Sequence, residues 1–101
     1  DELARVRAMA ETGAFAQAPL EEARAALATE EAELRSARAS LAQSEAQAAR
    51  LEQGLRVGVT ARREVDAART QVALGMARVT AAEQRATLAR EALAREERIR
   101  R

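Results

Sequence analysis

The residues best suited to chemistry are acidic side chains in two clusters. Glu30, Glu31 and Glu33 form one cluster, and Glu96 and Glu97 form the other. The sequence contains no His and no Cys, so the usual general base, nucleophile and soft metal ligands are missing. Carboxylates alone can bind a hard cation, but arginines three or four residues away offer them ion pairs on a solvated helix surface. We therefore expect no catalytic site, no metal site and no cofactor, and interpret the protein as something other than an enzyme.

The spacing of opposite charges predicts ion pairs within single helices. Residues four positions apart are neighbours on a helix surface. The pairs with this spacing are Glu31 with Arg35, Glu52 with Arg56, and Glu91 with Arg95. The basic stretch REERIRR (95–101) is interpreted as a solvated helix end in preference to a surface for acidic lipid or protein.

Composition indicates long helices and not a compact globule. Hydrophobic residues make up 48% of the 101 residues, but most are alanine, and Phe15 is the single aromatic residue. Alanine contributes little apolar area to a core, whereas Ala, Glu, Arg and Leu at helical spacing are typical of coiled coils. The net charge of +1 argues against a nucleic-acid-binding protein. No apolar run reaches the roughly 18 residues that a membrane-spanning helix needs.

A seven-residue spacing of apolar residues predicts two helices that pack along one seam. The seam residues are Leu20, Leu27, Leu34, Leu41, Val65, Val72, Val79 and Leu93, with Ala48 and Ala86 continuing the two rows. Three positions after members of these rows lie smaller residues, such as Ala68 and Gly75, which let two backbones approach closely. A strict seven-residue repeat keeps one row facing a partner helix, so we predict an antiparallel coiled coil.

Two glycine-containing stretches interrupt the helical pattern. They are GAFAQAPLEEAR (13–24) and GLRVGVTARREVD (54–66), and Gly13 aligns with Gly58 at an offset of 45 residues. Gly13 suits the position just after a helix end, and Pro19 suits the first turn of the next helix. The repeated pattern predicts a hairpin turn at each stretch.

These signals predict one all-α domain over residues 1–101. It is a long antiparallel two-helix coiled-coil hairpin with a short third helix at the N-terminus, which folds back at Gly13. The expected bounds are helix 2–12, helix 19–53, turn 54–60 and helix 61–100. Thr60 is expected to cap the last helix. The middle helix of roughly 35 residues would be about 50 Å long, so the two turns should lie at opposite ends of it.

The second stretch resembles the α-helical hairpin of periplasmic adaptor proteins, the membrane fusion proteins of the HlyD type. The similarity is carried by Arg50 and by the run Gly58-Val-Thr-Ala-Arg-Arg-Glu-Val-Asp-Ala-Ala-Arg69, in which a glycine turn precedes Glu-hydrophobic-Asp and an Ala-Arg pair. The tip of the family carries an Arg, a Leu four residues later and a Ser seven residues after that. In this sequence these positions are Arg50, Gly54 and Ala61, and Leu55 and Thr60 each lie one position away from the Leu and Ser positions.

The resemblance implies a protein that links an inner-membrane exporter, of an ABC type I secretion system or an efflux pump, to a TolC-type outer-membrane channel. The tip would meet the periplasmic end of the channel, and several copies would associate into a ring. The expected location is the periplasm of a Gram-negative bacterium, with the transporter contacts and the inner-membrane anchor outside these residues. The expected tip residues are Arg50, Leu55, Val57, Val59, Thr60 and Arg62.

Two other interpretations fit the same pattern. One is a segment of a TolC-type channel, which would be flanked by β-barrel strands, whereas an adaptor hairpin would be flanked by the halves of a lipoyl-like domain. The other is a generic structural coiled-coil spacer. If the first glycine stretch is the working tip, its contact residues are Met9 and Phe15.

Overall fold

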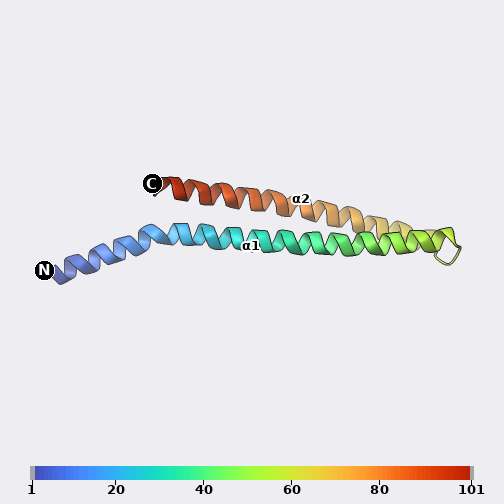
Figure 1. Cartoon of the computed structure of the whole chain (residues 1–101), viewed down its shortest axis with the longest axis horizontal. Coiled ribbons are helices and arrows are strands. Elements are labelled where there is room, and N and C mark those ends of the chain that lie inside the picture. Colours follow the sequence, from blue (N-terminus) through green and yellow to red (C-terminus); the bar gives the residue numbers. More distant parts are fainter. Residues whose placement is uncertain (1, 101) are drawn as a thin grey trace.

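The chain folds into two long helices that run side by side in opposite directions (Figure 1). The computed structural model describes the backbone of residues 2–100, and the side chains of these residues except Val6 and residues 8–16. Helix α1 spans Glu2–Arg56 and helix α2 spans Arg62–Ile99. The molecule measures 85 × 21 × 14 Å, which is the shape of a flat rod. The predicted all-α two-helix hairpin is therefore confirmed.

The predicted seam residues lie between the two helices. Leu34, Val65 and Val79 are at most 9% exposed. The half-buried members of the seam are Leu20, Leu27, Leu41, Val72 and Leu93. Ala82 and Ala86, which are 1% and 0% exposed, pack with Leu34 and Val79 in the middle of the rod. The core is thus a single line of small and branched side chains along the seam.

The two backbones approach closely where a glycine stands in the seam. Gly75 is buried against Leu41. A Cβ built at Gly75 would lie 3.1 Å from Leu41 Cδ1 and 3.5 Å from Leu41 Cα. A methyl group at this position would require the Leu41 side chain to shift slightly, and a bulkier side chain would push the two helices apart and weaken the packing on either side of it.

The first glycine stretch does not form a turn. Helix α1 continues through Gly13 and Pro19, so the expected helix 2–12 is the N-terminal part of α1 and the predicted fold-back at Gly13 is wrong. This part runs past the C-terminal end of α2, at an angle to the rest of α1 (Figure 1). A glycine inside a helix costs only about 1 kcal/mol relative to alanine, which is too little to end the helix. Pro19 lacks an N–H and crowds the preceding turn, and such a residue bends a helix without necessarily ending it.

The second glycine stretch forms the turn that joins the helices. The turn covers residues 57–61, so α1 extends past the expected end at residue 53 and includes Gly54. Helix α2 begins and ends within one residue of the expected bounds of 61–100.

Charged side chains pair across the two helices. The pairs are Arg69 Nε with Glu52 Oε1 at 2.8 Å, Arg85 Nε with Glu30 Oε2 at 3.2 Å, and Arg90 Nε with Glu31 Oε1 at 3.9 Å. The expected pairs of Glu31 with Arg35 and of Glu52 with Arg56 are not formed, because Glu31 and Glu52 lie beside the seam and reach the other helix. The third expected pair, Glu91 with Arg95, is also not formed in the described part of the chain. Exposed pairs of this kind contribute roughly 0.2–1 kcal/mol each, so they support the register more than the stability.

Candidate functional site

The turn between the helices has a defined backbone conformation that ends α1. Gly58 has a φ of 81°, a left-handed conformation that is easy only for glycine. The Val59 N–H donates to the Gly54 carbonyl over 2.8 Å, and the Gly58 N–H donates to the Leu55 carbonyl over 3.2 Å. These two hydrogen bonds around a left-handed glycine form a Schellman motif. The motif satisfies carbonyl groups at the end of α1 while the chain reverses direction.

Gly54 and Thr60 form a notch beneath the turn. The Thr60 N–H donates to the Gly54 carbonyl over 3.2 Å, and the half-buried Thr60 side chain packs on Gly54. A Cβ at Gly54 would collide with Thr60 Oγ1 and would lie 3.1 Å from Thr60 Cβ. The prediction that Thr60 caps the second helix is wrong, because the N-cap residue is Ala61, without a side-chain cap hydrogen bond. Thr60 instead packs against the end of α1.

Two valines of the turn are open to solvent. Val57 is 64% exposed and Val59 is 80% exposed. Leu55, the third apolar residue predicted at the tip, is half-buried at the end of α1. Leu55 therefore closes the end of the seam, whereas Val57 and Val59 form the apolar apex of the hairpin.

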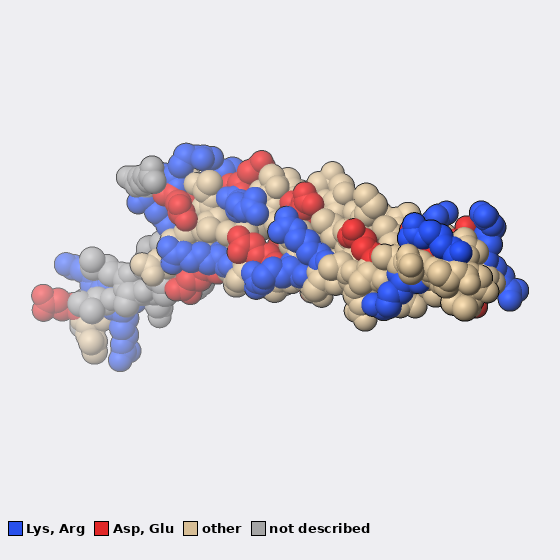
Figure 2. All heavy atoms as spheres, turned by 45° about the vertical axis from the view of Figure 1, so that its right-hand side comes forward, with Lys and Arg blue, Asp and Glu red and all other residues tan. Residues whose placement is uncertain are grey.

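Arginines flank these two valines. Arg56, Arg62 and Arg63 are exposed, and in the described structure none of them takes part in an ion pair or a side-chain hydrogen bond. Figure 2 shows blue basic atoms gathered at the right-hand end of the rod, which carries the turn. The acidic residue in the first turn of α2 is Glu64. The turn thus combines an apolar apex with unpaired positive charge.

Arg50 lies on the side of the rod and apart from the apex. Its guanidinium donates from Nη2 to Gln47 Oε1 over 2.6 Å. It lines a shallow groove with Gln47, Ala68 and Gln71, which belongs to the flank where the helices meet. The structure therefore brings together Leu55, Val57, Val59, Thr60 and Arg62, and places the remaining predicted tip residue, Arg50, away from them. The side chains of the alternative tip residues, Met9 and Phe15, lie outside the described residues.

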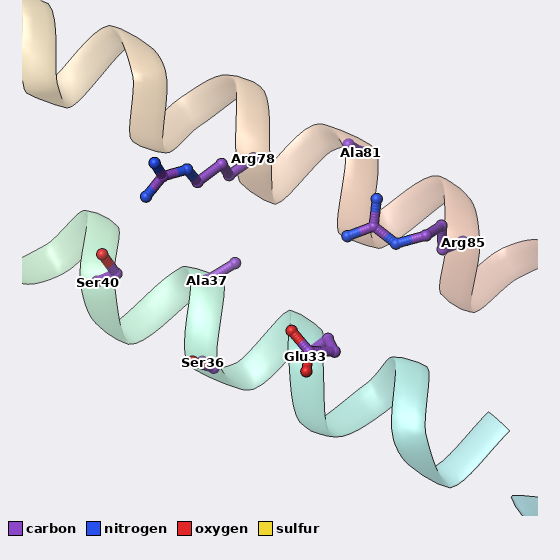
Figure 3. Close-up of a pocket in the computed structure, with 7 residues that line it drawn as sticks. All are labelled: Glu33, Ser36, Ala37, Ser40, Arg78, Ala81 and Arg85. Carbon is purple, nitrogen blue, oxygen red and sulfur yellow. The ribbon is translucent and has the colours of Figure 1, made fainter. Parts of the chain in front are cut away.

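Shallow grooves also follow the seam along the middle of the rod. The groove in Figure 3 is lined by Glu33, Ser36, Ala37, Ser40, Arg78, Ala81 and Arg85. Within the described residues, no group of His, Cys, Asp or Glu is arranged to hold a metal ion. No described helix combines the length and the apolar character needed to cross a membrane. The acidic cluster of the sequence instead supplies Glu30 and Glu31 to the ion pairs between the helices.

Comparisons with known proteins give no match to this chain, whether with family models, curated proteins or solved structures. The fold defines a class, the coiled-coil-like helical hairpin, and carries no family assignment. The resemblance to adaptor hairpins therefore rests on the sequence between Arg50 and Arg69.

Sequence reasoning identified most of the turn residues but missed two features of the turn. The first is the positive charge that Arg56 and Arg63 add beside the turn. The sequence signal for it is the presence of arginines on both sides of Gly58. The second is the notch between Gly54 and Thr60. The only sequence signal for it is a second glycine four residues before Gly58.

Proposed function

We propose that this chain is a protein-interaction module in which a two-helix rod presents its turn to a partner protein. The observation that carries the proposal is the exposure of Val57 and Val59 in a turn whose backbone is held by hydrogen bonds. Recognition residues commonly lie on loops that a rigid scaffold positions. A turn that is already ordered loses little conformational freedom on binding, so its apolar contacts contribute more fully to affinity.

Arg62 and Arg63 support the same role. They occupy the first turn of α2, where the positive end of the helix dipole disfavours positive charge. In the described structure no ion pair offsets this placement. The arginines therefore gain nothing within the hairpin itself, and they become favourable when a partner supplies carboxylates, which arginine binds with two parallel hydrogen bonds.

The partner that the sequence favours is the periplasmic end of a TolC-type channel, with this chain as the α-hairpin of a periplasmic adaptor. The run from Gly58 to Arg69 and the 85 Å rod support this assignment. In this proposal Val57, Val59 and Arg62 contact the channel, and Arg50 adds a contact on the flank. The adaptor's contacts with the inner-membrane transporter lie outside these residues, and several copies surround the axis of the channel.

Binding to a purified TolC-type channel tests the proposal. The combined change Val57→Ser and Val59→Ser should weaken binding about tenfold or more, because apolar residues at the centre of an interface contribute most of its energy. Ile99→Ser is the matched control, since Ile99 is 74% exposed at the other end of α2. Circular dichroism should show the same helicity for all three proteins.

Two outcomes would count against the proposal in different ways. Unchanged binding by the double serine variant would contradict the turn as the contact site. If the unaltered chain does not bind the channel at all, the assignment of the channel as partner is wrong.

A further inference from the structure

The seam between the two helices repeats every seven residues. Leu41 lies against Gly75, and one heptad farther from the turn Leu34 packs with Ala82. Long side chains of α1 thus meet small residues of α2. If α2 moved by seven residues toward the N-terminus of α1, a position that we call the slid register, Leu34 would meet Gly75. A long side chain would again meet a small residue, so the apolar seam alone does not distinguish the two registers.

Helix α1 has the length that the slid register needs. Ile99 lies 24 residues after Gly75, and Gln17 lies 24 residues before Leu41, so Ile99 and Gln17 are level in the observed register. From there α1 continues past the end of α2 to Glu2 (Figure 1). A movement of seven residues is about 10 Å along the rod. Each residue of α2 would therefore still have a residue of α1 at its level.

The turn region holds a second glycine at the spacing that the slid register needs. When the helices of a hairpin move past each other by seven residues, the centre of the turn moves along the chain by half that number. Gly54 lies four residues before Gly58. Glycine adopts the left-handed conformation at a helix end more easily than other residues do. The seam positions of α2 would then extend to Ala61 and Gly58, which are both small.

Charges on one flank of the seam distinguish the two registers. Glu52 pairs with Arg69 over 2.8 Å, and Glu31 pairs with Arg90 over 3.9 Å. Both pairs belong to rows with seven-residue spacing, so they define one register for the whole flank. We call this flank the ladder face, and it carries Arg24, Glu31, Arg38, Glu45 and Glu52 of α1 and Arg69, Met76, Glu83, Arg90 and Glu97 of α2.

Other residues of the ladder face also stand level with opposite charges. Seven-residue steps from the two formed pairs place Arg38 level with Glu83. They also place Arg24 level with Glu97, whereas Glu45 has an uncharged methionine at its level. Each of these rows alternates in sign, so the observed register brings no like charges level on this face.

The slid register would replace attraction by repulsion on the ladder face. Glu31 would stand level with Glu83, and Arg24 would stand level with Arg90. Exposed ion pairs are individually weak, but this movement removes attractions and adds repulsions at several levels at once. The ladder face therefore favours the observed register although the seam permits both.

Two charged residues would gain partners in the slid register. Glu45 lies seven residues before the present partner of Arg69 and would take its place. On the other flank, Arg78 lies seven residues before Arg85 and would take its place beside Glu30 (Figure 3). In the described structure Glu45 and Arg78 form no ion pair and no side-chain hydrogen bond. The slid register thus has ion pairs of its own, and the two registers differ mainly in the repulsions on the ladder face.

We propose that the hairpin has a second register, the slid register, in which Gly54 replaces Gly58 in the turn, and that the ladder face holds the chain in the observed register. In the second register the turn moves four residues toward α1, and Val59 becomes part of α2. The ladder face thereby couples the position of the helices to the surface that the turn presents. A ligand that binds the two registers unequally would shift their populations. The inference does not rest on the proposed function.

Engineered disulfides report the register directly, because the chain contains no cysteine. Ser44→Cys with Val72→Cys joins positions that are level in the observed register. Ala37→Cys with Val72→Cys joins positions that are level only in the slid register. In the observed register this second pair is about 10 Å apart along the rod, which is too far for a disulfide. On oxidation of the otherwise unaltered chain, the first disulfide should predominate.

An exchange of two charges on the ladder face should reverse this preference. Glu83→Arg with Arg90→Glu keeps the net charge, but it brings like charges level in the observed register and opposite charges level in the slid register. The disulfide of the slid register should then form about tenfold more readily relative to the other. Glu91→Arg with Arg95→Glu is the matched control, since both residues are exposed on α2 outside the ladder face. The control should leave the preference unchanged.

A distance between spin labels at Ala46 and Gln84 gives a second measurement without a disulfide. Both residues are exposed, and the slid register would lengthen their separation along the rod by about 10 Å. Pulsed electron paramagnetic resonance should show the longer distance in the exchange variant and the shorter one in the unaltered chain. An unchanged distance, an unchanged disulfide preference or a loss of helicity in the exchange variant would each overturn the proposal, because each would mean that the exchanged charges find no second register.

Discussion

Gly13 and Gly58 occupy matching positions 45 residues apart, yet α1 passes through the first and ends just before the second. The second glycine differs in its neighbours. Gly54 precedes it by four residues and Thr60 follows it by two, and these two residues pack into a notch that excludes a Cβ at Gly54. The comparison shows that a glycine ends this helix only where surrounding residues support the reversed chain.

The first stretch lacks the residues that build the notch. Met9 stands where the offset of 45 places Gly54, and Phe15 stands where it places Thr60. The notch requires a residue without a side chain at the first of these positions, and methionine does not meet that requirement. The second turn is also followed directly by burial, since Val65 is 1% exposed and Ala68 is 8% exposed. The turn at Gly58 is thus stabilised both locally and by the packing of the helices that it joins.

The largest effect should come from the buried seam between the two helices that the second turn joins. Val79→Glu would place a charge at a position that is 9% exposed, and should lower the free energy of unfolding by about 3 kcal/mol or more. Arg62→Glu, on the exposed surface, should change it by no more than about 0.5 kcal/mol. Urea unfolding followed by circular dichroism measures both. Equal losses would mean that the seam has been assigned to the wrong residues.

Alanine at the two turn glycines should have an intermediate effect. Gly58→Ala should lower the free energy of unfolding by about 1–2 kcal/mol, because the added Cβ meets no neighbour within 4 Å and the cost comes from φ alone. Gly54→Ala should be destabilising through its collision with Thr60, and Thr60→Ala should recover part of that loss. If Gly54→Ala proves stabilising, the notch does not exist in solution.

Alanine at Gly13 should have the smallest effect and the opposite sign. In a helix interior the replacement of glycine by alanine is favourable by up to about 1 kcal/mol. Gly13→Ala should therefore raise the helical signal in circular dichroism slightly. A fall in helicity would place Gly13 in a turn and would make the two glycine stretches equivalent.

The two helices and their seam are predictable from the sequence because apolar residues must recur at a strict spacing to stay on the face that meets the other helix. Leu34, Val65 and Val79 follow a seven-residue repeat, and they are buried as that repeat requires. The continuation of α1 through Gly13 and Pro19 is not predictable from these residues alone. Each of them weakens a helix, but ending the helix would need a supported turn in its place.

The turn residues are partly predictable for a related reason. The exposure of Val57 and Val59 is expected because both lie in the predicted turn 54–60. The Gly54–Thr60 notch and the pairing of Glu52 with Arg69 depend on contacts between residues on opposite sides of the turn. Spacing along one helix carries no information about such contacts, so the expected pairs within single helices were wrong.

A distance between spin labels at Ala4 and Arg24 tests most directly whether only the second glycine stretch forms a turn. These exposed residues lie at nearly equal separations before and after Gly13, and single cysteines can be introduced there into a chain that has none. A continuous helix separates their Cα atoms by about 30 Å, at 1.5 Å for each of 20 residues, less a small reduction from the bend in α1 that Figure 1 shows. Pulsed electron paramagnetic resonance should therefore give one long distance. A population at less than half of that distance would show that the chain folds back at Gly13, and would contradict the account.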